Sequence, residues 1–209
     1  MKKIILLGDS TREGYDKYVQ EQLVGTAEVL FPNENCQFAL YLLRHLQDWQ
    51  SSGNWGNDAD LVHWNAGLWD ALHLLRQEPL TDFEDYAKTV KRIDQWLRFM
   101  FPKAKIVFAT NTLGIDERYE NDKNFRLNAE IEEYNRYART ALEGTDTIID
   151  DLCEVSRKAP QEYYIDAVHI YAPEGRKLLG DAVLNCICPL LGIVKQAEGN
   201  WKDTETGDL

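Results

Sequence analysis

Short apolar runs alternate along this chain with stretches of helical periodicity, and this alternation limits the possible folds most strongly. The runs have the length and apolar character of buried strands. The intervening stretches repeat apolar residues every three or four positions, as a helix with one buried face does. Alternating strands and helices predict one parallel sheet with helices on both faces. The expected strands are 3–8, 27–31, 60–65, 105–110 and 147–149, and the expected helices are 14–23, 37–49, 81–100, 124–142 and 173–194.

The chain has 209 residues, enough for one domain with a sizeable core. It shows no internal repeat, low-complexity segment or domain boundary. We therefore expect one domain over residues 1–195. Residues 196–209 are polar and are expected to form a frayed C-terminal tail, which Trp201 could dock onto the domain.

The charge balance excludes several classes of partner. The 35 acidic and 23 basic residues give a formal net charge of −12. Binding to nucleic acid needs clustered Lys and Arg to neutralise phosphates, and anionic membranes attract basic surfaces. We therefore expect neither a nucleic acid nor a membrane as a partner. A small-molecule substrate fits the composition, whereas the oligomeric state is left open.

The start of the chain does not predict a signal peptide. Its apolar run, residues 4–7, is shorter than the roughly 7–15 apolar residues of a secretory signal. No run approaches the ~18 apolar residues of a membrane span. These features predict a cytoplasmic protein.

The four cysteines do not form a metal-binding pattern. Cys36 and Cys153 are isolated, and Cys186 and Cys188 lie in an apolar helical stretch with no His or Cys at zinc-ligand spacing. We expect reduced, buried thiols and no bound metal. A disulfide is the main alternative.

The most specific chemical signal joins two distant segments. The first expected strand ends at Gly8-Asp9-Ser10, so Ser10 lies at the carboxyl edge of the sheet, where α/β proteins bind ligands. Asp166 and His169 are three residues apart in the loop before the last helix. A hydroxyl, a base and a carboxylate that orients the base are the parts of a serine-hydrolase triad. Taken singly, Ser10 could be a helix N-cap and the other two could be ordinary loop residues.

With Gly8-Asp9-Ser10 and Asp166-x-x-His169, the chain resembles the SGNH/GDSL hydrolases over nearly its whole length. The resemblance implies a three-layer α/β/α sandwich around a five-stranded, flavodoxin-like parallel sheet. It also implies Ser10 as the nucleophile, His169 as the base and Asp166 as the residue that orients the base. No metal or organic cofactor is implied.

The blocks that stabilise the oxyanion in this family are altered here. Asn65-Ala66-Gly67-Leu68-Trp69-Asp70 stands where a Gly-x-Asn-Asp block is usual, and it resembles the variant found in the PC-esterase-like branch. The glycine of the family's second block is missing, and Asn35 lies in the segment that replaces it. We expect the Ser10 backbone N–H and the Asn65 amide to be oxyanion donors. Asn35 and Gly67 are weaker candidates.

Two residues beside these motifs are candidate substrate contacts. Arg12 could bind a carboxylate or a hydroxyl-rich group, or could instead pair with Glu13 or Asp16. Trp69 could form a wall of the substrate pocket, although aromatic side chains are more often used in the core. The same alternatives hold for Trp64, with core packing favoured.

The predicted activity is that of a serine esterase that removes a small acyl group. O-acetyl groups on a carbohydrate are the preferred substrate. The alternatives are a lipid or thioester hydrolase of the same fold, and a catalytically degenerate SGNH-fold protein that binds a ligand without turnover. Asp70 and His73 repeat the Asp-x-x-His spacing, so they are an alternative acid–base pair.

Overall fold

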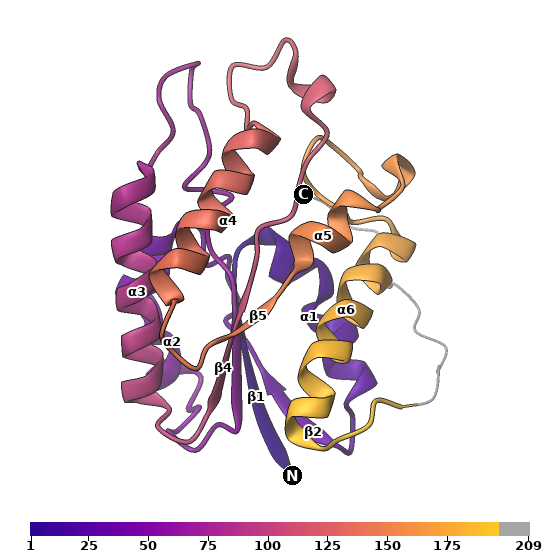
Figure 1. The fold of residues 1–209 in the computed structure, drawn as a ribbon. Helices are drawn as coiled ribbons and strands as arrows, with labels where there is room; N and C mark the ends of the chain where they lie inside the picture. Colours follow the sequence, from indigo (N-terminus) through magenta and orange to yellow (C-terminus); the bar gives the residue numbers. More distant parts are fainter. Residues whose placement is uncertain (197–209) are drawn as a thin grey trace.

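The fold is built on one sheet of five parallel strands in the order β2-β1-β3-β4-β5 (Figure 1). The computed structural model describes residues 1–196. This strand order is the flavodoxin-like one, so the predicted doubly wound α/β class is confirmed. The strands are β1 Lys2–Leu7, β2 Ala27–Leu30, β3 Leu61–Trp64, β4 Lys105–Ala109 and β5 Ile148–Asp150.

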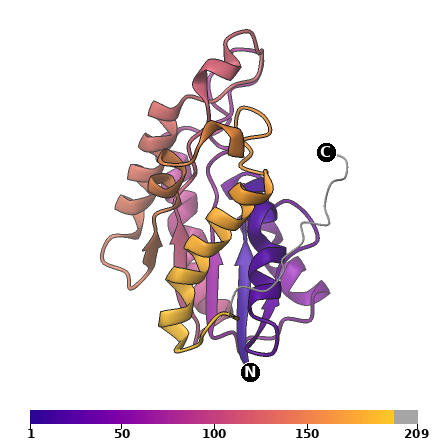
Figure 2. The same ribbon diagram turned by 90° about the vertical axis from the view of Figure 1, so that its right-hand side faces the viewer.

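Helices cover both faces of the sheet and make the three layers (Figure 1, Figure 2). Because side chains alternate between the faces of a strand, β1 contributes to two cores: Ile5 and Leu7 pack on one face, and Ile4 and Leu6 on the other. All four are fully buried. The first face carries α2 Ala39–Ser52, α3 Phe83–Met100 and α4 Asn128–Leu142, and the second carries α1 Ser10–Gln22, α5 Leu152–Arg157 and α6 Pro173–Leu191.

Several boundaries differ from those expected. Helix α1 begins at Ser10 rather than at residue 14, because the Asp9 side chain accepts a hydrogen bond from the Thr11 amide and caps the helix. Helix α4 begins at Asn128 rather than at residue 124, and α6 ends at Leu191, followed by Gly192 in the left-handed conformation. Three short elements were not predicted: α5 and the 3₁₀ turns Asp116–Tyr119 and Gln161–Tyr163.

The carboxyl edge of the sheet carries long loops that rise above the strands (Figure 1). The loop after β3 and the loop after β4 pair with each other through two backbone hydrogen bonds between His73 and Phe125. The loop after β4 also meets the segment before α6, since the Ile115 amide donates to the Ala167 carbonyl at 2.8 Å. Three segments distant in sequence therefore surround the end of β1.

None of the helices among residues 1–196 has the length and apolarity to span a bilayer. At the end of the described chain, Gln196 is docked through its backbone amide to Gln22 and through its side chain to Val24. The rest of the expected tail, with Trp201, lies outside the described residues. The four cysteines are unpaired, and all except the half-buried Cys186 are buried.

Candidate active site

A tight turn between β1 and α1 presents Ser10. Its glycine is required, because a Cβ on Gly8 would lie 1.9 Å from Oδ1 of Asn65. Asp9 is fully buried, and its Oδ1 accepts from the Thr11 amide at 2.9 Å and from Nδ2 of Asn65 at 3.0 Å. Asp9 therefore fixes the turn, and Ser10 begins the helix at the carboxyl edge of the sheet.

His169 lies within hydrogen-bond reach of both Ser10 and Asp166. The Ser10 Oγ is 3.0 Å from Nε2 of His169, and Nδ1 of the same ring is 2.5 Å from Oδ2 of Asp166. With the proton on Nδ1, the imidazole donates to Asp166 and leaves Nε2 free to accept the Ser10 proton. The geometry is that of a nucleophile, a general base and an orienting carboxylate.

The second oxygen of Asp166 is held by the chain itself. Oδ1 accepts from the backbone amides of Val168 and His169 at 2.8 and 2.7 Å. Partial burial raises the pKa of Asp166, but the hydrogen bonds from the His169 ring and from these two amides outweigh it and lower the pKa to about 2. Asp166 is therefore charged at neutral pH, as a residue that orients an imidazole must be.

Arg118 anchors the loop that carries Asp166. Its guanidinium donates to the carbonyls of Asp166 at 2.6 Å, Tyr164 at 3.1 Å and Gln161 at 3.3 Å. Arg118 could not be predicted from the sequence, because it lies in a polar loop and its acceptors are backbone groups more than 40 residues away. No pattern of side chains marks such a contact.

Tyr171 supports the other two members of the triad. Its hydroxyl donates to the Ser10 carbonyl, and its ring centre lies 5.0 Å from that of His169. The ring fills the space beside Gly14, where a Cβ would come within 2.7 Å of it. The position of Tyr171, two residues after His169, was the available sequence signal, and it was missed.

The expected oxyanion donors differ in their availability. The Ser10 backbone N–H has no acceptor among residues 1–196, as the first amide of a helix is free to donate. The Asn65 side chain is 1% exposed and its nitrogen donates to Asp9, so in this structure it supports the nucleophile turn. Its role as an oxyanion donor stays a prediction.

The two weaker oxyanion candidates are also engaged within the chain. Nδ2 of Asn35 donates to Glu13 at 2.8 Å. Gly67 has φ +142°, and a Cβ there would lie 2.2 Å from Nδ2 of Asn111, so the glycine permits close packing against that amide. Neither contact points to a free donor.

Cys36 lies in the segment after β2 and packs against the turn that presents Ser10. The Gly8 amide donates to its sulfur at 3.3 Å, and the Cys36 amide donates to the Gly8 carbonyl at 3.0 Å. Burial raises the pKa of the thiol to about 12. Cys36 therefore acts as a neutral packing residue below the nucleophile turn.

The structure corrects the expectation for Arg12. The side chain is 2% exposed, pairs with Asp16 at 2.5 Å and donates to the carbonyls of Pro32 and Glu34. Every direction of its guanidinium faces the protein, so Arg12 ties α1 to the segment after β2. The alternative pairing with Asp16 is the one observed, and Arg12 is not placed to bind substrate.

The structure also places the two tryptophans and the alternative pair of Asp70 and His73. Trp64 is fully buried and packs edge-on against Phe108, whereas Trp69 is half-buried in the turn after β3. Nε2 of His73 lies 2.6 Å from Glu130 rather than against Asp70. His73 is therefore a structural residue of the paired loops.

Asp70 ties the turn after β3 to α2, because its Oδ2 accepts from the Ala39 amide at 2.9 Å. Burial raises its pKa to about 6, and the charge of Asp9 adds to this, although hydrogen bonds oppose the shift. The charged form is thus disfavoured in the folded state. The protonated Asp70 therefore stabilises the fold. This contribution is fully present below the unfolded pKa of 3.8 and is lost as the pH rises through the folded pKa of about 6.

We therefore expect the wild type to lose free energy of unfolding relative to Asp70→Asn as the pH rises from about 4 to about 7. The expected change is on the order of 3 kcal/mol, since about two pKa units separate the two states and each unit corresponds to roughly 1.4 kcal/mol. Urea denaturation of both proteins at several pH values measures it. A difference that stays constant with pH would contradict the raised pKa.

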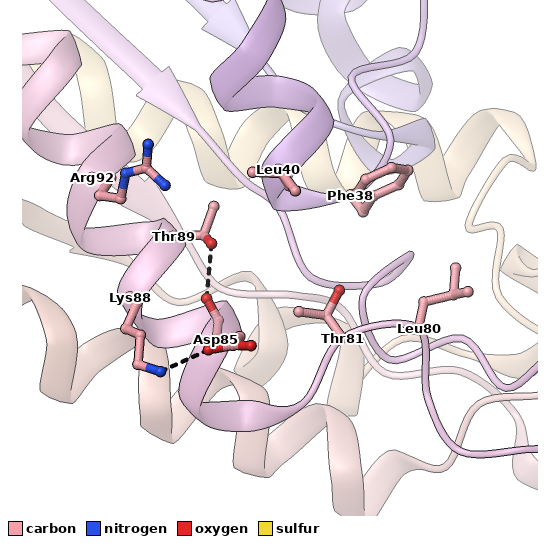
Figure 3. Close-up of a pocket in the computed structure, with 8 residues that line it drawn as sticks. All are labelled: Phe38, Leu40, Leu80, Thr81, Asp85, Lys88, Thr89 and Arg92. Atoms are coloured by element: carbon pink, nitrogen blue, oxygen red, sulfur yellow. Dashed lines mark hydrogen bonds and ion pairs between the residues drawn. The ribbon is translucent and has the colours of Figure 1, made fainter.

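A separate surface pocket lies between the starts of α2 and α3 (Figure 3). Phe38 and Leu40 line one side, and Lys88 and Arg92 project from α3 on the other. Lys88 is paired with Asp85 at 2.7 Å. None of the three triad residues lines this pocket.

Among residues 1–196, no group of three or more His, Cys, Asp or Glu side chains is placed to hold a metal ion. Unlike His169 and Asp166, the pair of His63 with Asp150 at 2.9 Å is buried.

Comparison with solved structures decides the fold family. A lipase/acylhydrolase from Enterococcus faecalis superposes with a TM-score of 0.71 and 17% identity over 95% of this chain and 100% of that one. The chain has the SGNH/GDSL hydrolase fold. The acetyl xylan esterase AlAXEase matches with a TM-score of 0.69 and 19% identity over 88% of this chain and 99% of that one. Axe2, an acetylxylan esterase from Geobacillus stearothermophilus, matches with a TM-score of 0.66 and 17% identity over 88% and 93%.

No protein-family model and no curated protein sequence matches the chain. The similarity to the SGNH/GDSL structures is thus a similarity of backbone geometry.

Proposed function

We propose that the protein is a serine esterase with Ser10 as nucleophile, His169 as base and Asp166 as the residue that orients the base. The observation that carries the proposal is the continuous hydrogen-bond chain from the Ser10 hydroxyl through His169 to the charged Asp166. The shared fold with esterases and lipases supports the same reaction class. No cofactor takes part in this chemistry.

The reaction proceeds in two halves. Ser10 Oγ attacks the ester carbonyl while Nε2 of His169 takes the hydroxyl proton, and the carbonyl oxygen becomes an oxyanion that the Ser10 N–H can stabilise. The tetrahedral intermediate collapses, and His169 returns the proton to the departing alcohol. A water molecule, deprotonated by His169, then attacks the acyl-enzyme and releases the acid and free Ser10.

We propose acetyl esters of carbohydrates as the substrate class. Two of the structural neighbours are acetylxylan esterases, and Trp69 is a half-buried aromatic residue in the turn after β3. The lipase/acylhydrolase neighbour makes a lipid ester the second candidate. The unpaired cysteines suit a reducing compartment, so we propose that the protein acts in the cytoplasm.

Hydrolysis rates on acetylated xylo-oligosaccharides, p-nitrophenyl acetate and p-nitrophenyl palmitate test the substrate class. We expect the acetyl esters to be hydrolysed and the palmitate to be a poor substrate. Trp69→Ala should change the ratio of kcat/KM between the sugar ester and p-nitrophenyl acetate by roughly tenfold, as loss of an aromatic contact does. Trp96→Ala, at a half-exposed position on α3, is the matched control and should not change this ratio.

Preference for the palmitate would favour the lipid alternative. Binding of the sugar ester without turnover would favour a degenerate, non-catalytic protein. An unchanged ratio in Trp69→Ala would remove Trp69 from the substrate pocket.

A further inference from the structure

We propose that Arg126 binds an anionic group of the substrate, so that the natural ester carries a carboxylate or a phosphate. This inference rests on the proposed esterase function and narrows its substrate class. Arg126 lies in the loop after β4, just before α4, and was not a candidate from the sequence. Its surroundings place it between the turn after β3 and the loop of Asp166.

The first contact joins Arg126 to the turn after β3. Its Nε donates to the carbonyl of Leu68, the residue directly before Trp69. The side chain is half-buried. Among residues 1–196 this is the only hydrogen bond of Arg126 at standard distance, and the guanidinium also lies close to the Tyr119 hydroxyl, so its terminal nitrogens have a neutral neighbour there but no charged partner. The guanidinium is thus anchored through Nε, while its terminal nitrogens can bind an anion.

The second contact joins Arg126 to the catalytic loop through Tyr119. The Tyr119 hydroxyl is screened from solvent and forms no hydrogen bond among the described residues. Burial raises the pKa of Tyr119 most, the adjacent Arg126 guanidinium lowers it, and the charges of Asp166 and Asp116 raise it, so Arg126 lies close to the Tyr119 hydroxyl. A Cβ on Gly114 would come within 3.8 Å of the Tyr119 ring and within 2.5 Å of the Ala167 carbonyl. Gly114 therefore lies beside both the Tyr119 ring and the segment between Asp166 and His169.

Arg126 differs from most arginines of this acidic chain in having no carboxylate partner among the described residues. The nearby Asp116 accepts from the Asn128 amide, and Glu130 bonds to His73, so neither neutralises Arg126. Six other arginines are paired with carboxylates: Arg12, Arg44, Arg98, Arg136, Arg139 and Arg157.

An open, half-buried guanidinium beside a catalytic site suits a planar anion. Two parallel N–H bonds to a carboxylate or phosphate match its geometry, and such bonds are stronger than those to neutral hydroxyls. The unpartnered Tyr119 hydroxyl adds a neutral donor at the same place. A role in structure alone would need only the Nε bond to Leu68.

The test compares matched acidic and neutral esters. Three acidic substrates place the anion differently: p-acetoxybenzoate and p-acetoxyphenyl phosphate on the alcohol, and mono-p-nitrophenyl glutarate on the acyl group. Methyl p-acetoxybenzoate, p-acetoxyanisole and p-nitrophenyl valerate are the neutral counterparts. We expect at least one acidic ester to exceed its neutral counterpart in kcat/KM by roughly 10- to 100-fold, mainly through KM.

Variants assign the effect to Arg126. Arg126→Gln should abolish the preference for the acidic ester and leave hydrolysis of the neutral one within about twofold, since the neutral ester gains no ion pair. Arg126→Lys should keep part of the preference, because the charge remains but the fork is lost. Arg92→Gln removes one exposed charge from α3 and is the matched control with an unchanged preference.

The outcomes separate this inference from the proposed function. Hydrolysis of neutral esters without preference for any acidic one overturns the role of Arg126 and leaves the esterase intact. Equal loss on both ester types in Arg126→Gln and Arg126→Lys also overturns it, because it marks a structural residue. If no ester is hydrolysed, the esterase proposal fails. In that case the anion site is tested by the melting temperature in the presence of p-hydroxybenzoate or inorganic phosphate. A rise that Arg126→Gln abolishes supports the anion site, and the absence of a rise contradicts it.

Discussion

Replacement of Ser10 by alanine should lower kcat/KM for p-nitrophenyl acetate by roughly 10⁴-fold or more, to a rate close to the background. The reason is covalent: without Oγ there is no atom to form the acyl-enzyme, and a water in its place lacks the fixed position 3.0 Å from His169. The steady-state rate of nitrophenol release measures the loss, with enzyme concentrations high enough to detect the residual activity.

The first control for Ser10→Ala is that the variant keeps its fold, which its melting temperature reports. Among residues 1–196 the Ser10 side chain bonds only to His169, and the turn is held by the backbone and by Asp9, so the melting temperature should change by a few degrees at most. Ser52→Ala, at an exposed position at the end of α2, should leave the rate unchanged. A Ser10→Ala protein that folds and retains a tenth of the wild-type rate would rule out Ser10 as the nucleophile.

Loss of the base should be nearly as severe. We expect His169→Ala to lower kcat by about as much as Ser10→Ala, since the pair acts as a unit. Asp166→Asn should cost roughly 10²–10⁴-fold, because an amide in place of the carboxylate no longer favours the tautomer with its proton on Nδ1. The double variant Ser10→Ala/His169→Ala should lose little more activity than Ser10→Ala alone. Fully additive losses of activity would contradict a shared mechanism.

The pH dependence separates the carboxylate from the base. The pKa of Asp166 is about 2, so it stays charged throughout the usual assay range and should not limit the rate above about pH 4. Because the folded value lies below the unfolded value of 3.8, the hydrogen bonds of Asp166 stabilise the fold above that pH and lose this effect as the pH falls towards 2. A loss of activity near pH 5 would therefore reflect the protonation of a group other than Asp166.

The sheet could be predicted because its signals are local, and so could the proximity of Ser10, Asp166 and His169. Each strand is a short apolar run with polar ends, and each of the three candidate catalytic residues lies near a strand or helix end. The start of α1 was missed by a few residues because the cap depends on the rotamer of Asp9. The short helix α5 has only six residues, too few for a periodic pattern to show.

The remaining site residues depend on contacts between segments far apart in sequence. Arg12 and Arg126 are the same residue type in polar surroundings, yet Arg12 is enclosed by acceptors from the segment after β2 and Arg126 is not. Asn65 lies beside Ser10 as expected, but its bond to Asp9 is visible only once both side chains are placed. Only the three-dimensional arrangement separates structural polar residues from free ones.

Covalent labelling tests the central claim most directly. A fluorophosphonate reacts with a serine only where a base activates it, so mass spectrometry of the treated protein reports the nucleophile and its base together. We predict one adduct on the wild type, located on Ser10, no adduct on Ser10→Ala and strongly slowed labelling of His169→Ala. An unlabelled wild type, or an adduct that persists on another residue in Ser10→Ala, would contradict the assignment of Ser10 as an activated nucleophile.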